Sequence, residues 1–337
     1  MRKSVWLFVV SVLTVLALSA CGSKSQEEVV EHLTKKVEKY TSYKAKAKMT
    51  LKMGMDPQTY DIEVWHNKPE YYRVNLKHEG KSESQMILKN DSGVYVLTPA
   101  LNKSYKFQSD WPENTSQAYL YESLVKDILE DPNAKFKETK ENYVFETKTR
   151  YQDTKMLPYQ EITFNKKDLS PKSVKVMDPD RNTLVTVKFS EVSFDVKFDK
   201  DAFDTKKNMT GAQLEIPVST NENDNQFTVK YPMAELPGVT LVDEKEVVTE
   251  NGKRVVLTYG GEKSFTIVQQ KVEVMPAATV STVVNGKMVD LGFTIGAMND
   301  HSITWMHDGV EYMLASTDLS PEEMVMLAKS VQGDMVK

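Results

Sequence analysis

Residues 43–53 read YKAKAKMTLKM and carry the clearest structural signal in the chain. Because successive side chains of a β-strand point to opposite faces, this alternation predicts an antiparallel strand with one buried face and one face in water. The expected buried set is Tyr43, Ala45, Ala47, Met49, Leu51 and Met53. We interpret the intervening lysines as a solvated face; a contact with phosphate or anionic lipid is the alternative.

Other segments repeat this alternation between turn residues. We expect strands at 60–65, 71–76, 84–88, 94–97, 103–107, 143–148, 159–165, 171–177 and 184–192. Two helices accompany them: one opens with the S-x-x-E capping box of residues 25–28, and one spans residues 117–130. So many antiparallel strands with so few helices predict a large curved sheet whose concave face is covered by a helix.

The last third of the chain has core signals of its own. Residues 219–226 are polar, with no large apolar side chain, and predict a linker. A hairpin is expected around Asn251 and Gly252, then further strands, and a closing helix that begins at Ser320. We therefore divide the chain into a leader at 1–20, a β-rich domain at 21–210, a linker at 211–226 and a small α+β domain at 227–337.

The first twenty residues predict an export signal. Arg2 and Lys3 precede an apolar run, residues 5–18, which is shorter than the roughly 20 residues that a membrane-spanning helix needs. Leu18, Ser19 and Ala20 then stand before Cys21, as in the lipobox that signal peptidase II recognises in bacterial lipoproteins. We expect a diacylglycerol on Cys21 to hold the protein at the extracytoplasmic face of the cell membrane, since two acyl chains anchor stably.

Charge and cysteine content argue against nucleic-acid binding, disulfide bonds and thiolate metal sites. The formal charge of the chain is -5, and loss of Arg2 and Lys3 with the leader makes it -7, which argues against nucleic acid. Cys21 is the only cysteine, so no disulfide and no thiolate metal site is expected.

Catalytic motifs are scarce. Ser123 and Lys126 form an S-x-x-K pair, but the other motifs of penicillin-binding proteins are missing, so we interpret the pair as a coincidence of helical spacing. His301 and His307 are too few for a zinc site, which needs three or four ligands. We expect no enzyme, no metal and no cofactor besides the diacylglycerol.

Residues 64–73, VWHNKPEYYR, look like the strand-turn-strand signature of the LolA-like lipoprotein carriers, and residues 87–99 continue the likeness. The residues that carry it are Trp65, Lys68, Pro69, Arg73 and Gly93. The resemblance covers residues 25–205 and implies an unclosed antiparallel β half-barrel with covering helices, around an apolar cavity for acyl chains. In the carrier, an arginine before the proline latches the helical lid. Lys68 stands there in this chain, and an ammonium cannot reproduce the planar, multi-donor fork of a guanidinium. The sequence therefore does not predict whether Lys68 latches a lid.

Residues 301–312 and 319–328 resemble the end of the DUF4367-type domain of Gram-positive lipoproteins. Together with the anchor and the LolA-like body, they resemble the YdcC-type sporulation lipoproteins of spore-forming bacteria, which are related to the GerS germination lipoproteins. This resemblance implies an envelope role in sporulation or germination. The two-domain order also resembles stress sensors of the RseB kind, which bind lipid and a protein partner.

The expected fold class is mainly β (α+β): a LolA-like half-barrel followed by a smaller α+β domain. The leading functional hypothesis is a membrane-anchored protein that binds lipid, acyl chains or a lipoprotein. The expected cavity lining is Tyr43, Ala45, Ala47, Met49 and Leu51, although the same residues form an ordinary core if helices fill the space. The alternative is a protein-interaction module that recruits or activates a cortex peptidoglycan hydrolase and binds no lipid.

Overall fold

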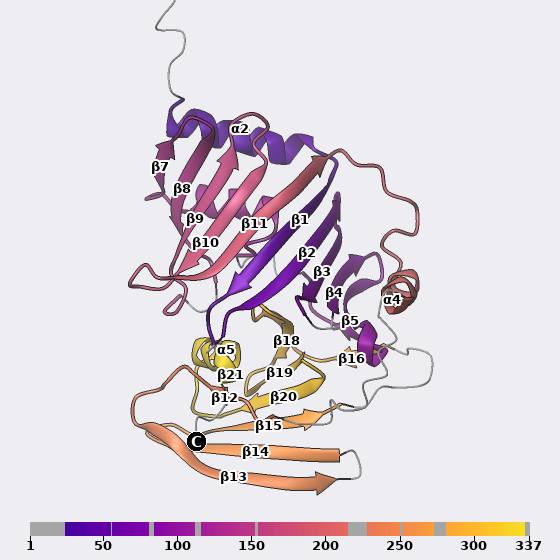
Figure 1. The fold of residues 1–337 in the computed structure, drawn as a ribbon, viewed down its shortest axis with the longest axis vertical. Helices are drawn as coiled ribbons and strands as arrows, with labels where there is room; N and C mark the ends of the chain where they lie inside the picture. Colours follow the sequence, from indigo (N-terminus) through magenta and orange to yellow (C-terminus); the bar gives the residue numbers. More distant parts are fainter. Residues whose placement is uncertain are drawn as a thin grey trace, which may run out of the picture.

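The computed structural model describes residues 24–54, 56–80, 84–111, 116–151, 154–214, 228–249, 252–272 and 281–333. About half of them lie in the strands of two sheets, as expected for a mainly β chain (Figure 1). The larger sheet has twelve strands in the order β16-β6-β5-β4-β3-β2-β1-β11-β10-β9-β8-β7. Their bounds are β1 Ser42–Leu51, β2 Gln58–Asn67, β3 Tyr71–His78, β4 Ser84–Asn90, β5 Gly93–Thr98, β6 Lys103–Phe107, β7 Lys135–Glu138, β8 Asn142–Lys148, β9 Tyr159–Asn165, β10 Pro171–Met177, β11 Thr183–Phe194 and β16 Thr282–Val284.

The alternation of residues 43–53 sets the orientation of strand β1 at the centre of this sheet. β1 pairs antiparallel with β2 on one side and with β11 on the other. Its apolar side chains are buried, whereas Lys46 and Lys48 are exposed. We call the face that carries Tyr43 the inner face and the face that carries Lys46 the outer face.

Two helices cover the inner face. Helix α2 (Gln26–Lys39) begins with the expected capping box, in which Ser25 Oγ accepts from Glu28 N and the Glu28 carboxylate accepts from Ser25 N. Helix α3 (Tyr121–Glu130) begins four residues later than expected, because residues 117–120 form a turn closed by a Leu120 N to Gln117 O bond of 3.0 Å. Among the described residues, no helix is long and apolar enough to cross a membrane.

The C-terminal third forms a seven-stranded sheet in the order β13-β14-β15-β20-β19-β18-β17. Its strands are β13 Val239–Thr249, β14 Gly252–Gly261, β15 Phe265–Lys271, β17 Lys287–Asp290, β18 Ile295–Met298, β19 Ser302–His307 and β20 Val310–Ala315, beside the short pair β12 Tyr231–Pro232 and β21 Val331–Gly333. Helix α5 (Pro321–Ser330) starts with the expected capping box at Ser320 and lies between this sheet and the larger one (Figure 1).

The two sheets are physically joined, a feature that the sequence pattern did not anticipate. Strand β16 belongs to the expected C-terminal domain but pairs in parallel with β6 of the larger sheet. Apolar residues of both sheets also belong to one continuous core. The boundaries at 210 and 226 remain a prediction.

A second apolar cluster lies on the outer face, under helix α4 (Thr205–Leu214). It consists of Met86, Leu88, Tyr95, Leu97, Ala202, Phe203 and Met209, with Trp65, Tyr71, Phe198 and Ala212 at its margin. Strands β4 and β5 are therefore buried on both faces, unlike β1, whose lysines face water. The short 3-10 helix η1 (Pro99–Leu101) follows β5 beside α4.

Candidate functional site

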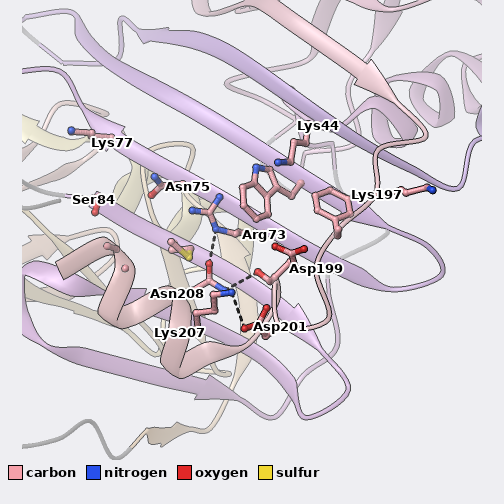
Figure 2. Close-up of a pocket in the computed structure, with 16 residues that line it drawn as sticks. Lys44, Arg73, Asn75, Lys77, Ser84, Lys197, Asp199, Asp201, Lys207 and Asn208 are labelled. Atoms are coloured by element: carbon pink, nitrogen blue, oxygen red, sulfur yellow. Dashed lines mark hydrogen bonds and ion pairs between the residues drawn. The ribbon is translucent and has the colours of Figure 1, made fainter. Parts of the chain in front are cut away.

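An open groove runs over the outer face of the larger sheet, between strands β1 to β4 and the segment 197–212 (Figure 2). Its volume is about 360 Å³, within the range of roughly 300 to 1,000 Å³ typical of ligand sites. We call it the outer groove. Its lining residues are Lys44, Trp65, Arg73, Asn75, Lys77, Ser84, Met86, Lys197, Phe198, Asp199, Asp201, Ala202, Lys207, Asn208, Gly211 and Ala212.

A row of cross-strand neighbours forms the centre of the groove. Lys44, Trp65 and Arg73 lie opposite one another on β1, β2 and β3. Lys44 Nζ lies 4.0 Å from the Trp65 ring centroid, and Arg73 Cζ lies 4.1 Å from it. Because cations are attracted to the face of an indole, the two side chains hold the Trp65 ring in a fixed orientation.

Arg73 joins the sheet to helix α4. Its Nη1 donates to Glu63 Oε2 at 2.6 Å and its Nε donates to Asn208 Oδ1 at 2.8 Å. Asn208 Nδ2 in turn donates to the backbone oxygen of Ala202 at 2.9 Å. Such charge-assisted bonds are stronger than neutral ones, so they fix the position of α4 relative to the groove floor.

The groove carries an excess of positive charge. Five of its lining residues are lysine or arginine and two are aspartate, in a chain whose formal charge is -5. Lys207 Nζ lies 2.7 Å from Asp201 Oδ2, and the hydrogen bond from Lys207 lowers the pKa of the Asp201 carboxyl. Within the described part of the chain, Lys44, Lys77 and Lys197 have no carboxylate within ion-pair distance.

Two polar atoms in the groove floor also lack a partner. Trp65 Nε1 is a buried donor and Asn75 Oδ1 is a buried acceptor, and neither has a hydrogen bond among the described residues. Buried polar atoms without partners are uncommon in folded proteins, so both atoms have unused bonding capacity.

The structure separates the five signature residues. Trp65 and Arg73 meet in the groove, whereas Lys68 and Pro69 lie at the turn between β2 and β3, and Gly93, with φ +127°, starts β5 at the turn from β4. The Lys68–Pro69 peptide bond is cis.

Lys68 contacts the C-terminal end of helix α2. Its Nζ donates to the backbone oxygen of Val37 and, at 3.2 Å, to that of Glu38, and lies 4.1 Å from the Tyr40 ring centroid. Cations at a helix C-terminus bond the free carbonyls and interact favourably with the helix dipole. Partial burial lowers the pKa of Lys68. A single ammonium therefore ties α2 to the sheet.

The expected cavity-lining residues of β1 are packed. Tyr43, Ala45, Ala47, Met49 and Leu51 are between 1% and 6% exposed and belong to the main hydrophobic core. Tyr43 Oη donates to Glu122 Oε2 on α3 at 3.1 Å, and burial raises the pKa of the Tyr43 hydroxyl well above its usual value. This packing agrees with the core-filling alternative; a role as ligand lining stays a prediction.

The S-x-x-K pair, Ser123 and Lys126, lies on helix α3. Ser123 Oγ accepts from Gln117 N at 2.9 Å, and Lys126 Nζ lies 3.8 Å from Glu130 Oε1, so each has a structural contact of its own. Within the residues that the structure describes, no group of three or more metal-ligating side chains is present. Cys21 and the residues Leu18, Ser19 and Ala20 lie outside the described residues.

Sequence reasoning singled out Trp65 and Arg73 but missed the segment that closes the groove over them. Residues 194–203, FDVKFDKDAF, place Phe198 and Phe203 five residues apart among charged residues. Phe198 packs against Trp65 with ring centroids 5.5 Å apart. The spacing of these aromatic residues fits neither a helix nor a strand, so periodicity alone could not reveal the segment.

Comparisons with known proteins identify relatives of this chain. The family model described as sporulation protein YdcC-like matches residues 2–203. The sporulation protein YdcC of Bacillus subtilis (strain 168) is 56% identical over 337 residues, covering 100% of this chain and 99% of that protein.

Solved structures give weaker likenesses. A putative outer membrane lipoprotein-sorting protein domain from Vibrio parahaemolyticus is 12% identical with a TM-score of 0.31, and the match covers 54% of this chain and 97% of that one. The complex of the CwlD amidase from Clostridioides difficile with the GerS lipoprotein matches at 17% identity and a TM-score of 0.23, covering 53% of this chain and 98% of the matched chain. By the family match and the full-length relative, the chain belongs to the YdcC-like sporulation proteins.

Proposed function

We propose that this chain is a lipid-anchored protein of the extracytoplasmic membrane face that acts in sporulation or germination by binding a protein partner, and not as an enzyme. Family membership supports the sporulation role, and the lipobox ending at Cys21 supports the anchor. Protein binding is favoured over an acyl-chain cavity because the inner-face residues of β1 are filled by the chain's own core, whereas the outer groove is open.

A pull-down from sporulating cells tests this function directly. The full chain, solubilised from membranes, is compared with the Cys21→Ala variant, which is expected to leave the membrane. We expect the anchored form to capture specific envelope proteins. The variant should lose those proteins whose binding requires the chain to be at the membrane. Absence of any specific partner with either form would contradict the proposal.

The anchor has a separate test. Growth with a fatty-acid analogue is expected to label the mature protein and to leave Cys21→Ala unlabelled. An unlabelled wild-type protein that still begins at Met1 would refute the anchor.

Binding of an acyl chain is the second candidate, and one observation favours it. An apolar cleft of about 210 Å³ lies between strand β16 of the larger sheet and the C-terminal sheet, with Phe107, Val284, Ile295 and Trp305 among its lining. This volume is below the roughly 300 Å³ at which ligand pockets begin, so the cleft would have to widen to take a chain. Native mass spectrometry of Cys21→Ala separates the two candidates, since co-purified lipid supports the second.

A further inference from the structure

We propose that the outer groove binds an extended acidic segment of a protein partner. The proposal rests on the protein-binding function above and names the chemistry of the partner and the surface that receives it. The observation that supports it is a row of cationic side chains along an open, partly apolar groove.

The cations are spread along the length of the groove. In Figure 2, Lys77 lies at one end and Lys197 at the other, with Arg73 and Lys44 between them. Lys77 and Lys197 are exposed, and no described carboxylate pairs with either. A row of this kind fits carboxylates spaced along an extended chain, and its local field attracts an acidic partner although the protein as a whole is acidic.

The groove also offers apolar surface between the charges. Phe198 and Ala212 are partly exposed along it beside the Trp65 ring. Apolar anchors of this kind provide much of the affinity in protein interfaces. We therefore expect the acidic segment to carry an apolar side chain between its carboxylates.

One further feature favours a peptide over an anionic polymer such as polyphosphate. Asp199 and Asp201 line the same groove and would repel a uniform row of negative charge.

The test uses a fluorescein-labelled peptide, EDLEDLED, added to the full-length protein in detergent micelles and followed by fluorescence anisotropy. The neutral peptide QNLQNLQN and polyphosphate are the comparison probes. The groove variant is Lys44→Gln/Lys77→Gln/Lys197→Gln. The matched control is Lys52→Gln/Lys137→Gln/Lys172→Gln, which removes the same charge from exposed positions outside the groove.

We expect the acidic peptide to bind, the neutral one to bind much more weakly, and the groove variant to lose about tenfold in affinity while the control stays close to wild type. Binding is also expected to weaken with salt. Phe198→Ala is expected to weaken EDLEDLED more than EDGEDGED, because only the former carries the apolar anchor.

Three results would overturn the inference: equal losses in the groove and control variants, no binding of the acidic peptide, or polyphosphate binding as tightly as the peptide and displacing it. If the groove variant still captures the same envelope proteins from sporulating cells, the groove is not the docking surface although the binding function stands. If wild type captures none, the binding function itself fails.

Discussion

Loss of the Arg150 guanidinium is expected to be among the most damaging single changes in the part of the chain that forms the larger sheet. Arg150 Nε donates to Asp127 Oδ1, and the Asp127 side chain is 0% exposed. Asp127 also accepts from Ser116 Oγ at 2.9 Å and from Gln160 Nε2 at 2.6 Å. This network joins helix α3 to strand β9, which carries Gln160, and to the segment after β8, which carries Arg150.

Arg150→Met keeps the apolar stem of the side chain and removes its charge. Breaking a buried ion pair in this way costs about 3 to 5 kcal/mol, because the remaining charge is left without compensation. Lys175→Met is the matched control: Lys175 Nζ lies 2.7 Å from Glu161 Oε1, but the two side chains are 47% and 35% exposed. We expect this exposed pair to contribute at most about 1 kcal/mol.

Urea unfolding of both variants in the Cys21→Ala background measures the difference. Burial raises the pKa of Asp127, and Arg150 opposes that rise. In Arg150→Met the pKa of Asp127 should rise further, so the loss of stability should shrink as the pH falls and Asp127 becomes protonated. A loss below about 1 kcal/mol, or one equal to that of Lys175→Met, would refute the assignment of a buried ion pair.

Two further predictions concern helix α2 and the interface between the sheets. Lys68→Met should lower the free energy of unfolding by about 1 to 2 kcal/mol and increase hydrogen exchange at the end of α2. Lys68→Arg should retain most of the stability. Equal loss of stability in both variants would argue against the helix contact. Asp290 accepts from Tyr119 Oη at 3.2 Å, and burial raises its pKa above 3.8. The folded state then binds the proton more tightly than the unfolded state, so the contribution of Asp290 to stability falls as the pH rises from about 3.8 through the raised pKa. Asp290→Asn should flatten this part of the pH profile in urea unfolding, and an unchanged slope would contradict it.

Local patterns predicted the elements well. The alternation of residues 43–53 correctly predicted β1 and its buried face, and the capping boxes at Ser25 and Ser320 correctly predicted two helix starts. These signals are local, because the period of a strand and the unpaired N–H groups of a helix start depend only on neighbours in sequence. The start of α3 was predicted four residues early, because the turn at 117–120 continues the apolar pattern of the helix.

The outer groove was not predicted from the sequence. Trp65 and Arg73 stood out only as residues that carry the family resemblance. Their meeting with Lys44 depends on the pairing of three strands, and Asn208 reaches Arg73 from 135 residues further along the chain. Periodicity reports which side chains share a face and says nothing of which distant segment covers that face.

The sequence by itself determined the β-rich class, the buried face of β1, two helix starts and membership of the YdcC-like family, because each is written in local spacing or in residue identity. Only the tertiary structure decided that β16 joins the larger sheet, that the inner-face residues of β1 lie in a shared core, and that α4 closes a cationic groove on the outer face. These features arise from contacts between segments far apart in the chain. Burial of apolar surface determines which segments pack together, and the periodicity of each segment does not show which distant segment it will contact.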